Sequence, residues 1–285
     1  MEVDLILHNG KIHTVDRSNP LAEAVAVKDG LFAAVGTDKE IMALRGKGTK
    51  VIDLKRRTVI PGLNDSHLHL IRGGLNYNLE LRWEGVPSLA DALRMLKEQA
   101  ARTPAPQWVR VVGGWSEFQF AERRMPTLDE INAAAPDTPV FVLHLYDRAL
   151  LNRAALRVVG YTKDTPNPPG GEIQRDAKGE PTGLFIARPN AMLLYASLAK
   201  GPKLPFEYQV NSTRQFLREL NRLGITSAID AGGGFQNYPD DYKVIEHLEA
   251  EKLLTVRIAY NLFTQRPKEE LDDFKRWVSS SRYGA

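Results

Sequence analysis

The hydrophobic pattern of this chain changes near residue 59, and that change constrains the fold more than any other feature. Before it, short runs alternate apolar and polar residues, and the dipeptides Asn9-Gly10 and Asp29-Gly30 separate these runs. Both dipeptides favour the positive φ angles that two-residue hairpin turns need. The pattern therefore predicts an antiparallel β unit over residues 1–58, with a hairpin at each dipeptide.

After residue 59, short apolar runs alternate with helical patterns. The predicted strands include Val109–Val112, Val140–Leu145 and Ile225–Ile229. The second is strongly apolar, as expected when helices cover both faces of a sheet. Ser88–Asp91 and Thr127–Glu130 are typical of helix starts. Because strand and helix alternate, we expect parallel βαβ units with right-handed crossovers, and so an α/β domain over residues 59–285.

One segment interrupts this alternation. Residues 161–182 hold many Pro, Gly, Asp and Asn residues, which favour turns over regular structure. The segment follows a helix that is predicted from Leu151 to Val159. The segment is predicted to be a long loop with an embedded hairpin that turns at Lys178-Gly179. A loop of this length is usually either functional or an insertion.

Composition excludes several classes of protein. The chain has no cysteine, so disulfides, thiolate zinc sites and a cysteine nucleophile are excluded. The formal charge of +3 is slight, and basic residues are interleaved with acidic ones, so no nucleic-acid-binding face is expected. No apolar run approaches the roughly 20 residues that span a bilayer. The first residues lack the pattern of a signal peptide, and a cytoplasmic protein is expected.

Two histidines close the first strand of the α/β region, at His67 and His69. Side chains two residues apart on an extended backbone point to the same side, so both imidazoles are expected to project together. Two imidazoles that face one point form half of a divalent metal site. The alternative is a polar strand end with two solvated histidines. The preceding apolar run and the neighbouring Asp65 favour metal ligation by both histidines.

The same segment carries a family resemblance. Pro61-Gly62-Leu63-Asn64-Asp65-Ser66-His67-Leu68-His69 resembles the first-strand metal motif of the amidohydrolase superfamily. Later stretches resemble the branch that includes N-substituted formamide deformylases. These stretches are Val112–Trp115, Gly170–Ile173 with Asp176, Gly179–Gly183, and Leu223–Ser227 with Asp230–Gly232. The resemblance runs in order along nearly the whole chain, so it is more specific than the histidine pair alone.

The resemblance implies a partial (β/α)8 TIM-type barrel with an N-terminal β-sandwich segment. Residues 1–58 would be the N-terminal part of the sandwich, and residues 59–285 the first part of the barrel, with a loop and hairpin insertion around 161–182. It also implies a metal-dependent hydrolase that acts on amide-like C–N bonds of a small molecule, with zinc or a similar divalent metal. The general base and the remaining ligands are expected on later strands, so the chain is expected to be a truncated N-terminal portion, inactive by itself.

Four further residues are candidates for a supporting or pocket role. Asp65 either orients a ligand imidazole or belongs to a strand-end turn. Asp230 ends a predicted strand, where barrel enzymes place functional side chains, or else caps a helix or bonds a loop. Trp115 either forms a pocket wall or packs in the core. His144 is either a third ligand or a core histidine with a hydrogen-bonded ring.

A second hypothesis belongs to another class of protein. The chain would then be a non-catalytic or degenerate half-barrel fragment that needs a partner segment. Open strand edges and apolar helix faces would favour a homo-oligomer or association with a missing C-terminal half. A dehydrogenase is a third interpretation, based on the run Gly232-Gly233-Gly234, but the spaced dinucleotide fingerprint is absent. Further His and Asp codons downstream of Ala285 would favour the hydrolase.

Overall fold

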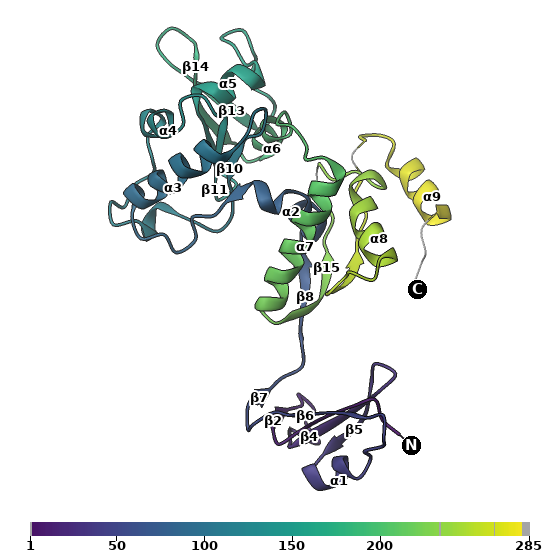
Figure 1. Ribbon diagram of the computed structural model, residues 1–285. Coiled ribbons are helices and arrows are strands. Elements are labelled where there is room, and N and C mark those ends of the chain that lie inside the picture. Colours follow the sequence, from purple (N-terminus) through teal and green to yellow (C-terminus); the bar gives the residue numbers. More distant parts are fainter. Residues whose placement is uncertain (1, 234, 265, 281–285) are drawn as a thin grey trace. The chain divides into compact units, whose positions relative to one another are not determined.

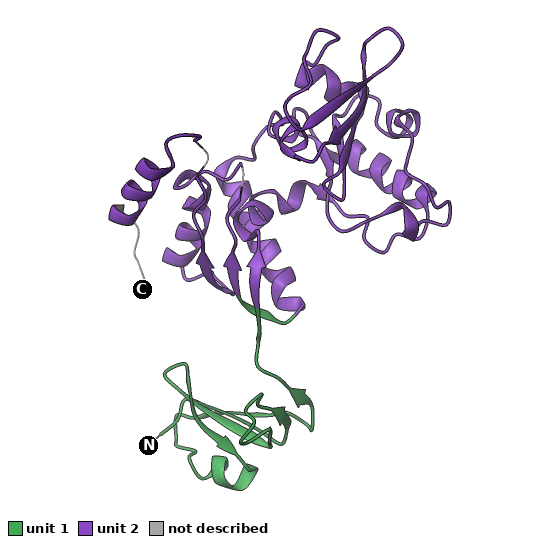
Figure 2. Ribbon diagram, turned by 180° about the vertical axis from the view of Figure 1, so that it is seen from behind, with its two compact units in different colours: residues 1–64, 224–227 green, residues 65–223, 228–285 purple. Residues whose placement is uncertain are grey.

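The computed structural model describes residues 2–233, 235–264 and 266–280, and these residues form a mixed α/β fold with several sheets (Figure 1). The α/β class predicted from the sequence is therefore confirmed. The chain divides into two compact units, which Figure 2 colours separately: residues 1–64 with 224–227, and residues 65–223 with 228–285. None of the described helices is long and apolar enough to cross a membrane.

The elements follow one another along the chain as labelled in Figure 1. The strands are β1 (Leu5–His8), β2 (Lys11–His13), β3 (Leu21–Ala22), β4 (Ala24–Lys28), β5 (Leu31–Gly36), β6 (Lys50–Asp53), β7 (Thr58–Val59), β8 (Leu63–Leu68), β9 (Glu80–Leu81), β10 (Val109–Val111), β11 (Val140–His144), β12 (Arg148–Leu151), β13 (Gly171–Arg175), β14 (Pro181–Ala187), β15 (Ile225–Asp230) and β16 (Arg257–Tyr260). The α-helices are α1 (Asp38–Met42), α2 (Leu70–Asn76), α3 (Leu89–Arg102), α4 (Leu128–Ala134), α5 (Arg153–Val159), α6 (Met192–Leu198), α7 (Phe206–Arg222), α8 (Lys243–Ala250) and α9 (Glu270–Ser280). Short 3-10 turns are η1 (Tyr77–Leu79), η2 (Glu117–Gln119) and η3 (Asp240–Tyr242).

The first unit contains the predicted hairpin at Asp29-Gly30. Strands β4 and β5 pair antiparallel, with Lys28 opposite Leu31. Asp29 and Gly30 have φ angles of 50° and 75°, as a two-residue turn between twisted strands requires. This part of the sequence prediction is confirmed, because both turn residues tolerate the left-handed conformation.

The hairpin predicted at Asn9-Gly10 is wrong. Strand β1 pairs with β4 and β6, whereas β2 pairs with β3 and β7 in a different sheet. Asn9 does turn the chain, with a φ of 55°, but both edges of β1 are already occupied by other strands. The pairs β1–β6 and β2–β7 are parallel, so the unit is not wholly antiparallel as predicted.

The second unit contains a six-stranded sheet with the order β13-β14-β12-β11-β10-β9. Strands β9, β10 and β11 are parallel, in agreement with the predicted βαβ pattern. Strand β12 then runs antiparallel to β11, in place of the start of the helix predicted from Leu151. The chain reverses through Leu145 and Tyr146, whose φ angles are 43° and 63°. Since neither residue is Gly or Pro, the local sequence does not indicate this turn.

The segment around 161–182 contributes to the same sheet. Strands β13 and β14 form an antiparallel hairpin that turns near Lys178-Gly179, as predicted. The Asp176 carboxylate accepts hydrogen bonds from the backbone N–H groups of Lys178 (2.8 Å) and Glu180 (3.0 Å). Because β14 also pairs with β12, the hairpin extends the sheet and is not only a loop.

Helices cover both faces of the six-stranded sheet. On β11, Val140 and Val142 pack in one buried cluster with residues of α3 and α4. The alternate residues Phe141 and Leu143 pack in another, with residues of α5 and α6. The strand is thus buried on both faces, which explains why Val140–Leu143 is an uninterrupted apolar run.

The predicted helix starts are confirmed by their caps. The Ser88 hydroxyl accepts a hydrogen bond from the backbone N–H of Asp91 at the start of α3. At α4, Thr127 and Glu130 bond to each other's backbone N–H groups, which completes a capping box. Local patterns therefore predict both helix starts, and at α3 the distant Glu122 adds a further acceptor, for the backbone N–H of Leu89 at 2.8 Å.

A three-stranded sheet with the order β8-β15-β16 carries the histidine motif. Strands β8 and β15 are parallel, because backbone bonds join Leu63 to Gly224 near their starts and Leu68 to Ala231 near their ends. Helix α2, which follows β8, packs against α7. A side chain in place of Gly74 would lie 3.0 Å from Thr213, so this glycine permits the close approach.

Candidate functional site

The two histidines of the motif lie together at the end of β8. His67 is in the strand, and His69 is the residue that precedes α2. Their ring centroids are 5.6 Å apart and the ring planes meet at 78°. His67 is exposed and His69 is half-buried. The two-residue spacing on an extended backbone therefore brings both imidazoles to one place.

One ring nitrogen of His69 is fixed by the main chain. Its Nδ1–H donates to the carbonyl oxygen of Gly232, at 2.6 Å. A carbonyl can only accept, so the bond assigns the proton to Nδ1 and leaves the lone pair on Nε2. Histidines that bind metals typically make such a bond with the nitrogen that does not face the metal.

Gly232 is required for this geometry. Its φ is 71°, and a Cβ at this position would lie 2.7 Å from the backbone oxygen of Asn261. Any other residue would strain the turn and push the carbonyl away from His69. The turn therefore explains why position 232 of the glycine run is a glycine. Gly234 lies outside the described residues.

Asp230 is buried at the end of β15, and among the described residues its carboxylate accepts hydrogen bonds from Ile71, Gly232 and Gln236. Oδ1 accepts from the backbone N–H of Ile71 (3.1 Å), in the first turn of α2. Oδ2 accepts from the backbone N–H of Gly232 (3.2 Å) and from the Gln236 side chain (2.8 Å). Asp230 therefore makes both the helix cap and the loop bond that the sequence predicted as alternatives. Its partner Gly232 is the residue whose carbonyl oxygen bonds to His69.

Asp65 supports the motif through the backbone. Its Oδ1 accepts a hydrogen bond from the backbone N–H of His67, at 3.0 Å. This contact corresponds to the strand-end alternative, since the carboxylate holds the main chain of His67. A role in orienting an imidazole is not visible in this arrangement.

His144 is the last residue of β11 in the six-stranded sheet, and Trp115 lies in the segment that follows β10. Trp115 is completely buried, and its indole N–H donates to the carbonyl oxygen of Leu143 at 2.9 Å. It packs against the rings of Trp83 and His144, in the core. The structure thus places Trp115 in core packing.

His144 is enclosed by two carboxylates. Its Nε2 is 2.8 Å from Glu117, and its Nδ1 is 2.9 Å from Asp147. With both ring nitrogens engaged, no lone pair is left for a metal. The structure places His144 as a hydrogen-bonded histidine at the end of β11, which is the second of the two roles considered from the sequence.

The electrostatics of this cluster keep both carboxylates ionised. Burial raises the pKa of Glu117, but bonds from its own backbone N–H and from His144 outweigh that effect and lower the pKa overall. For Asp147, burial is likewise outweighed by bonds from Arg148 and His144, and its pKa is lowered. Glu117 could not be predicted from the sequence as a partner of His144, because 27 residues separate the two and no motif joins them.

The donor set fits two positions of a divalent metal site. Two imidazoles lie side by side, and the bond from His69 to Gly232 leaves its Nε2 available as a ligand. Over residues 2–233, 235–264 and 266–280, no group of three or more His, Cys, Asp or Glu side chains is arranged to hold a metal. Within these ranges the site therefore offers two ligands and no third.

Comparison with known proteins gives matches over most of the chain. The family described as "Amidohydrolase family" matches residues 50–284. The protein LONG AFTER FAR-RED 3 of Arabidopsis thaliana is 32% identical over 243 residues, which cover 84% of this chain and 40% of that protein. An N-substituted formamide deformylase of Arthrobacter pascens is 31% identical over 230 residues, which cover 80% of this chain and 42% of the enzyme. The chain thus spans less than half the length of these two relatives.

A solved structure shows a similar fold. An uncharacterized metal-dependent hydrolase from Pyrococcus horikoshii OT3 superimposes with a TM-score of 0.64 and 22% sequence identity. The superposition covers 99% of this chain and 52% of that protein. At this level of identity the likeness concerns the fold.

Proposed function

Because this chain belongs to the amidohydrolase family, we propose that it is the N-terminal portion of a metal-dependent hydrolase that cleaves amide-like C–N bonds in a small molecule. The family predicted from the sequence motifs is confirmed by the match over residues 50–284. The name of the Arthrobacter pascens relative supports a C–N bond as the target, since a deformylase of N-substituted formamides cleaves one.

A single observation carries the metal site. The His69 ring is fixed by Gly232 at 2.6 Å, and His67 lies beside it. Both imidazoles would hold the metal, and we propose zinc because nitrogen ligands suit it. A divalent ion supplies positive charge that acidifies water and polarises a carbonyl group.

The residues of this chain then have distinct tasks. His67 and His69 would bind the metal. The Gly232 carbonyl keeps the proton of His69 on Nδ1, and the Asp65 carboxylate accepts a hydrogen bond from the backbone N–H of His67. A general base is not among them. We assign it, with the remaining ligands, to segments of the complete hydrolase that this chain does not contain.

The partial barrel is part of this proposal. The parallel strands β9, β10 and β11, and the parallel pair β8 and β15, are of the type that a (β/α)8 barrel contains. Residues 59–285 would form its first part, and residues 1–58 the N-terminal segment of a β-sandwich. A cytoplasmic location stays a prediction from the sequence.

A second candidate function is a non-catalytic half-barrel that needs a partner. It is favoured by the donor set, because the described ranges bring only two imidazoles together and no third ligand. Such a chain would self-associate or bind a complementary segment through its exposed edges. The two candidates share the histidine pair and differ in whether hydrolysis occurs in the completed protein.

One experiment separates them. Zinc binding to this chain is measured by calorimetry, with the double variant His67→Ala/His69→Ala as the control. Release of amine from a panel of N-substituted amides is then assayed with this chain and with a version extended by the codons that follow Ala285. We expect weak zinc binding that the double variant loses, no hydrolysis by this chain, and hydrolysis by the extended protein that the double variant abolishes. Hydrolysis that is unchanged in the extended double variant would contradict the proposal.

A further inference from the structure

We propose that Asp230 is a positioning residue for His69: it holds the turn at Gly232 so that the Gly232 carbonyl fixes the proton on Nδ1. The inference rests on the proposed function only in taking His69 as a metal ligand. The contacts that carry it are independent of any metal.

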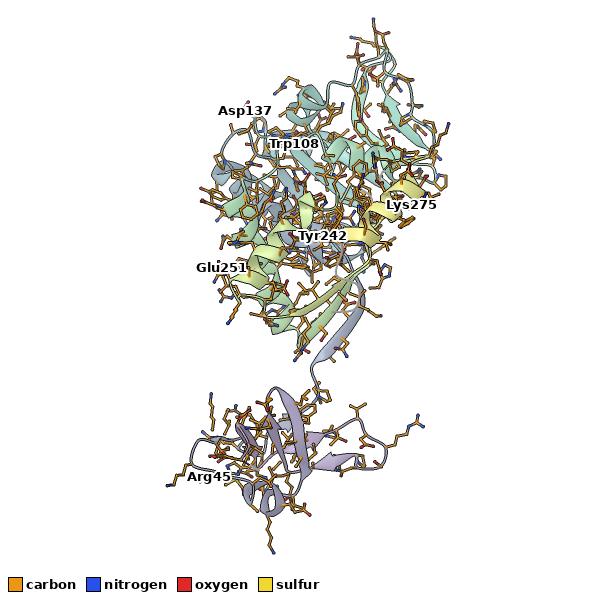
Figure 3. All side chains as sticks on the ribbon, turned by 90° about the vertical axis from the view of Figure 1, so that its right-hand side faces the viewer. Arg45, Trp108, Asp137, Tyr242, Glu251 and Lys275 are labelled. Atoms are coloured by element: carbon orange, nitrogen blue, oxygen red, sulfur yellow. The ribbon has the colours of Figure 1, made fainter. Side chains whose placement is uncertain are left out.

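The Asp230 carboxylate is held from several sides. It is completely buried, and its three donors come from α2, from the turn after β15 and from the Gln236 side chain. Gln236 in turn donates to the hydroxyl of Tyr242 at 2.6 Å, and Tyr242, which is labelled in Figure 3, is itself buried. A buried carboxylate with so many partners has little freedom to move, because each lost bond would leave a buried polar group unpaired.

Helix α2 shows why Asp230, and not His69, caps it. His69 occupies the N-cap position, but its side chain makes no capping bond. Asp230 supplies the acceptor for Ile71 instead, and its negative charge suits the positive end of the helix. Because Asp230 makes the capping bond, the His69 imidazole makes none and bonds to the Gly232 carbonyl.

The turn at Gly232 is fixed on both sides. Its backbone N–H donates to Asp230, and the Asn261 backbone lies so close that a Cβ at Gly232 would be 2.7 Å from its oxygen. The N–H of Asn261 also donates to the carbonyl oxygen of Asp230, at 2.8 Å. Asp230 thus determines where the Gly232 carbonyl points, and that carbonyl determines which nitrogen of His69 keeps a lone pair.

The variant Asp230→Asn separates the cap from the positioning role. The amide oxygen can still accept from Ile71, but the amide nitrogen then faces two donors, Gly232 and Gln236, and repels them. The cap survives while the bond to the turn is lost. Asp241→Asn is the matched control: Asp241 is another buried carboxylate, 8% exposed, which accepts from Asn237 and pairs with Lys203.

Two readouts are measured on the 285-residue chain. The tautomer of His69 is read from imidazole nitrogen chemical shifts, and zinc affinity from a titration with Zn²⁺ followed by the same shifts. We expect the Nδ1–H tautomer in the wild type and in Asp241→Asn, and a mixture of tautomers in Asp230→Asn. Zinc affinity should fall about ten- to a hundred-fold in Asp230→Asn, the usual effect of removing a group that orients a ligand.

A folded Asp230→Asn protein with the wild-type tautomer would overturn the inference. If Asp230→Asn does not fold, the wild type still provides a test. The inference requires a protected Gly232 amide in hydrogen exchange together with the Nδ1–H tautomer, and a freely exchanging Gly232 amide overturns it. Because the tautomer needs no metal, a shifted tautomer without any zinc binding would leave the positioning role intact and contradict only the weak zinc binding expected under the proposed function.

Discussion

The Nδ1 atom of His69 lies 2.6 Å from the carbonyl oxygen of Gly232, although 163 residues separate the two along the chain. The contact joins the end of β8 to the turn that follows β15, because the two strands are parallel neighbours and end side by side. A local motif, the histidine pair, is therefore completed by a distant backbone atom.

Replacing Gly232 by alanine should disturb this contact. The variant strains a φ of 71° and places a Cβ 2.7 Å from the Asn261 oxygen, so we expect a loss of about 1–3 kcal/mol in the free energy of unfolding. The His69 tautomer should shift as well. The control is Gly114→Ala, since a Cβ at Gly114 meets nothing within 4 Å. Urea unfolding and imidazole nitrogen shifts measure the two effects, and equal stability of both variants would contradict the argument.

Glu80 should make stability depend on pH near neutrality. Burial raises its pKa to about 7 from an ordinary value of 4.5, against the opposing charges of Arg82 and Arg110. Because the folded pKa is the higher one, the stability that Glu80 contributes is fully present below about pH 4.5 and is lost as the pH rises to about 7. The change should be on the order of 3 kcal/mol, since one pKa unit corresponds to about 1.4 kcal/mol.

The variant Glu80→Gln tests this dependence, because an amide does not titrate. Urea unfolding between pH 4 and pH 8 should show a flatter profile for Glu80→Gln than for the wild type. Glu251→Gln, at the exposed end of α8 (Figure 3), should keep the wild-type profile. If the free energy of unfolding depended on pH equally in the wild type and in Glu80→Gln, the buried Glu80 carboxyl would not be the cause of the pH dependence.

Local signals determine the parts of the fold that could be predicted. The cap at Thr127 and the turn at Asp29-Gly30 involve residues within four positions of each other, and both are confirmed. The predicted hairpin at Asn9-Gly10 is wrong, because the partners of β1 are the distant strands β4 and β6. Strand β12 was missed because no Gly or Pro marks the turn at Leu145 and Tyr146.

The candidate site follows the same rule. The spacing of His67 and His69 is a property of one strand, so the juxtaposition of their rings could be predicted. The bonds of Asp230 to Ile71 and Gly232 depend on which strands are neighbours. The sequence alone therefore could not decide whether Asp230 lines the site, caps a helix or bonds a loop. Glu117 carries no sequence signal, since its contact with His144 exists only in the folded sheet.

Glu117 should contribute to acid sensitivity. Its pKa in the folded protein is lower than the ordinary 4.5, despite burial, because its own backbone N–H and His144 bond to the carboxylate. The stability from this group is therefore present above about pH 4.5 and is lost as the pH falls through the lowered folded pKa. In Glu117→Gln, unfolding between pH 3 and pH 6 should depend less on pH than in the wild type. Asp147→Asn should act in the same direction, and an unchanged acid transition in both variants would disprove the role of the cluster.

Trp115 should behave as a core residue. Replacing it by phenylalanine removes the indole N–H that donates to Leu143 at 2.9 Å and leaves a buried carbonyl unpaired beside a cavity. We expect a loss of about 1–3 kcal/mol in the free energy of unfolding. Phe118→Ala is the control, because Phe118 is 66% exposed, and should change stability by less than about 0.5 kcal/mol. If Trp115→Phe were as stable as the wild type, the packing against Trp83 and His144 would not explain why the indole is buried, and a pocket wall would be the better interpretation.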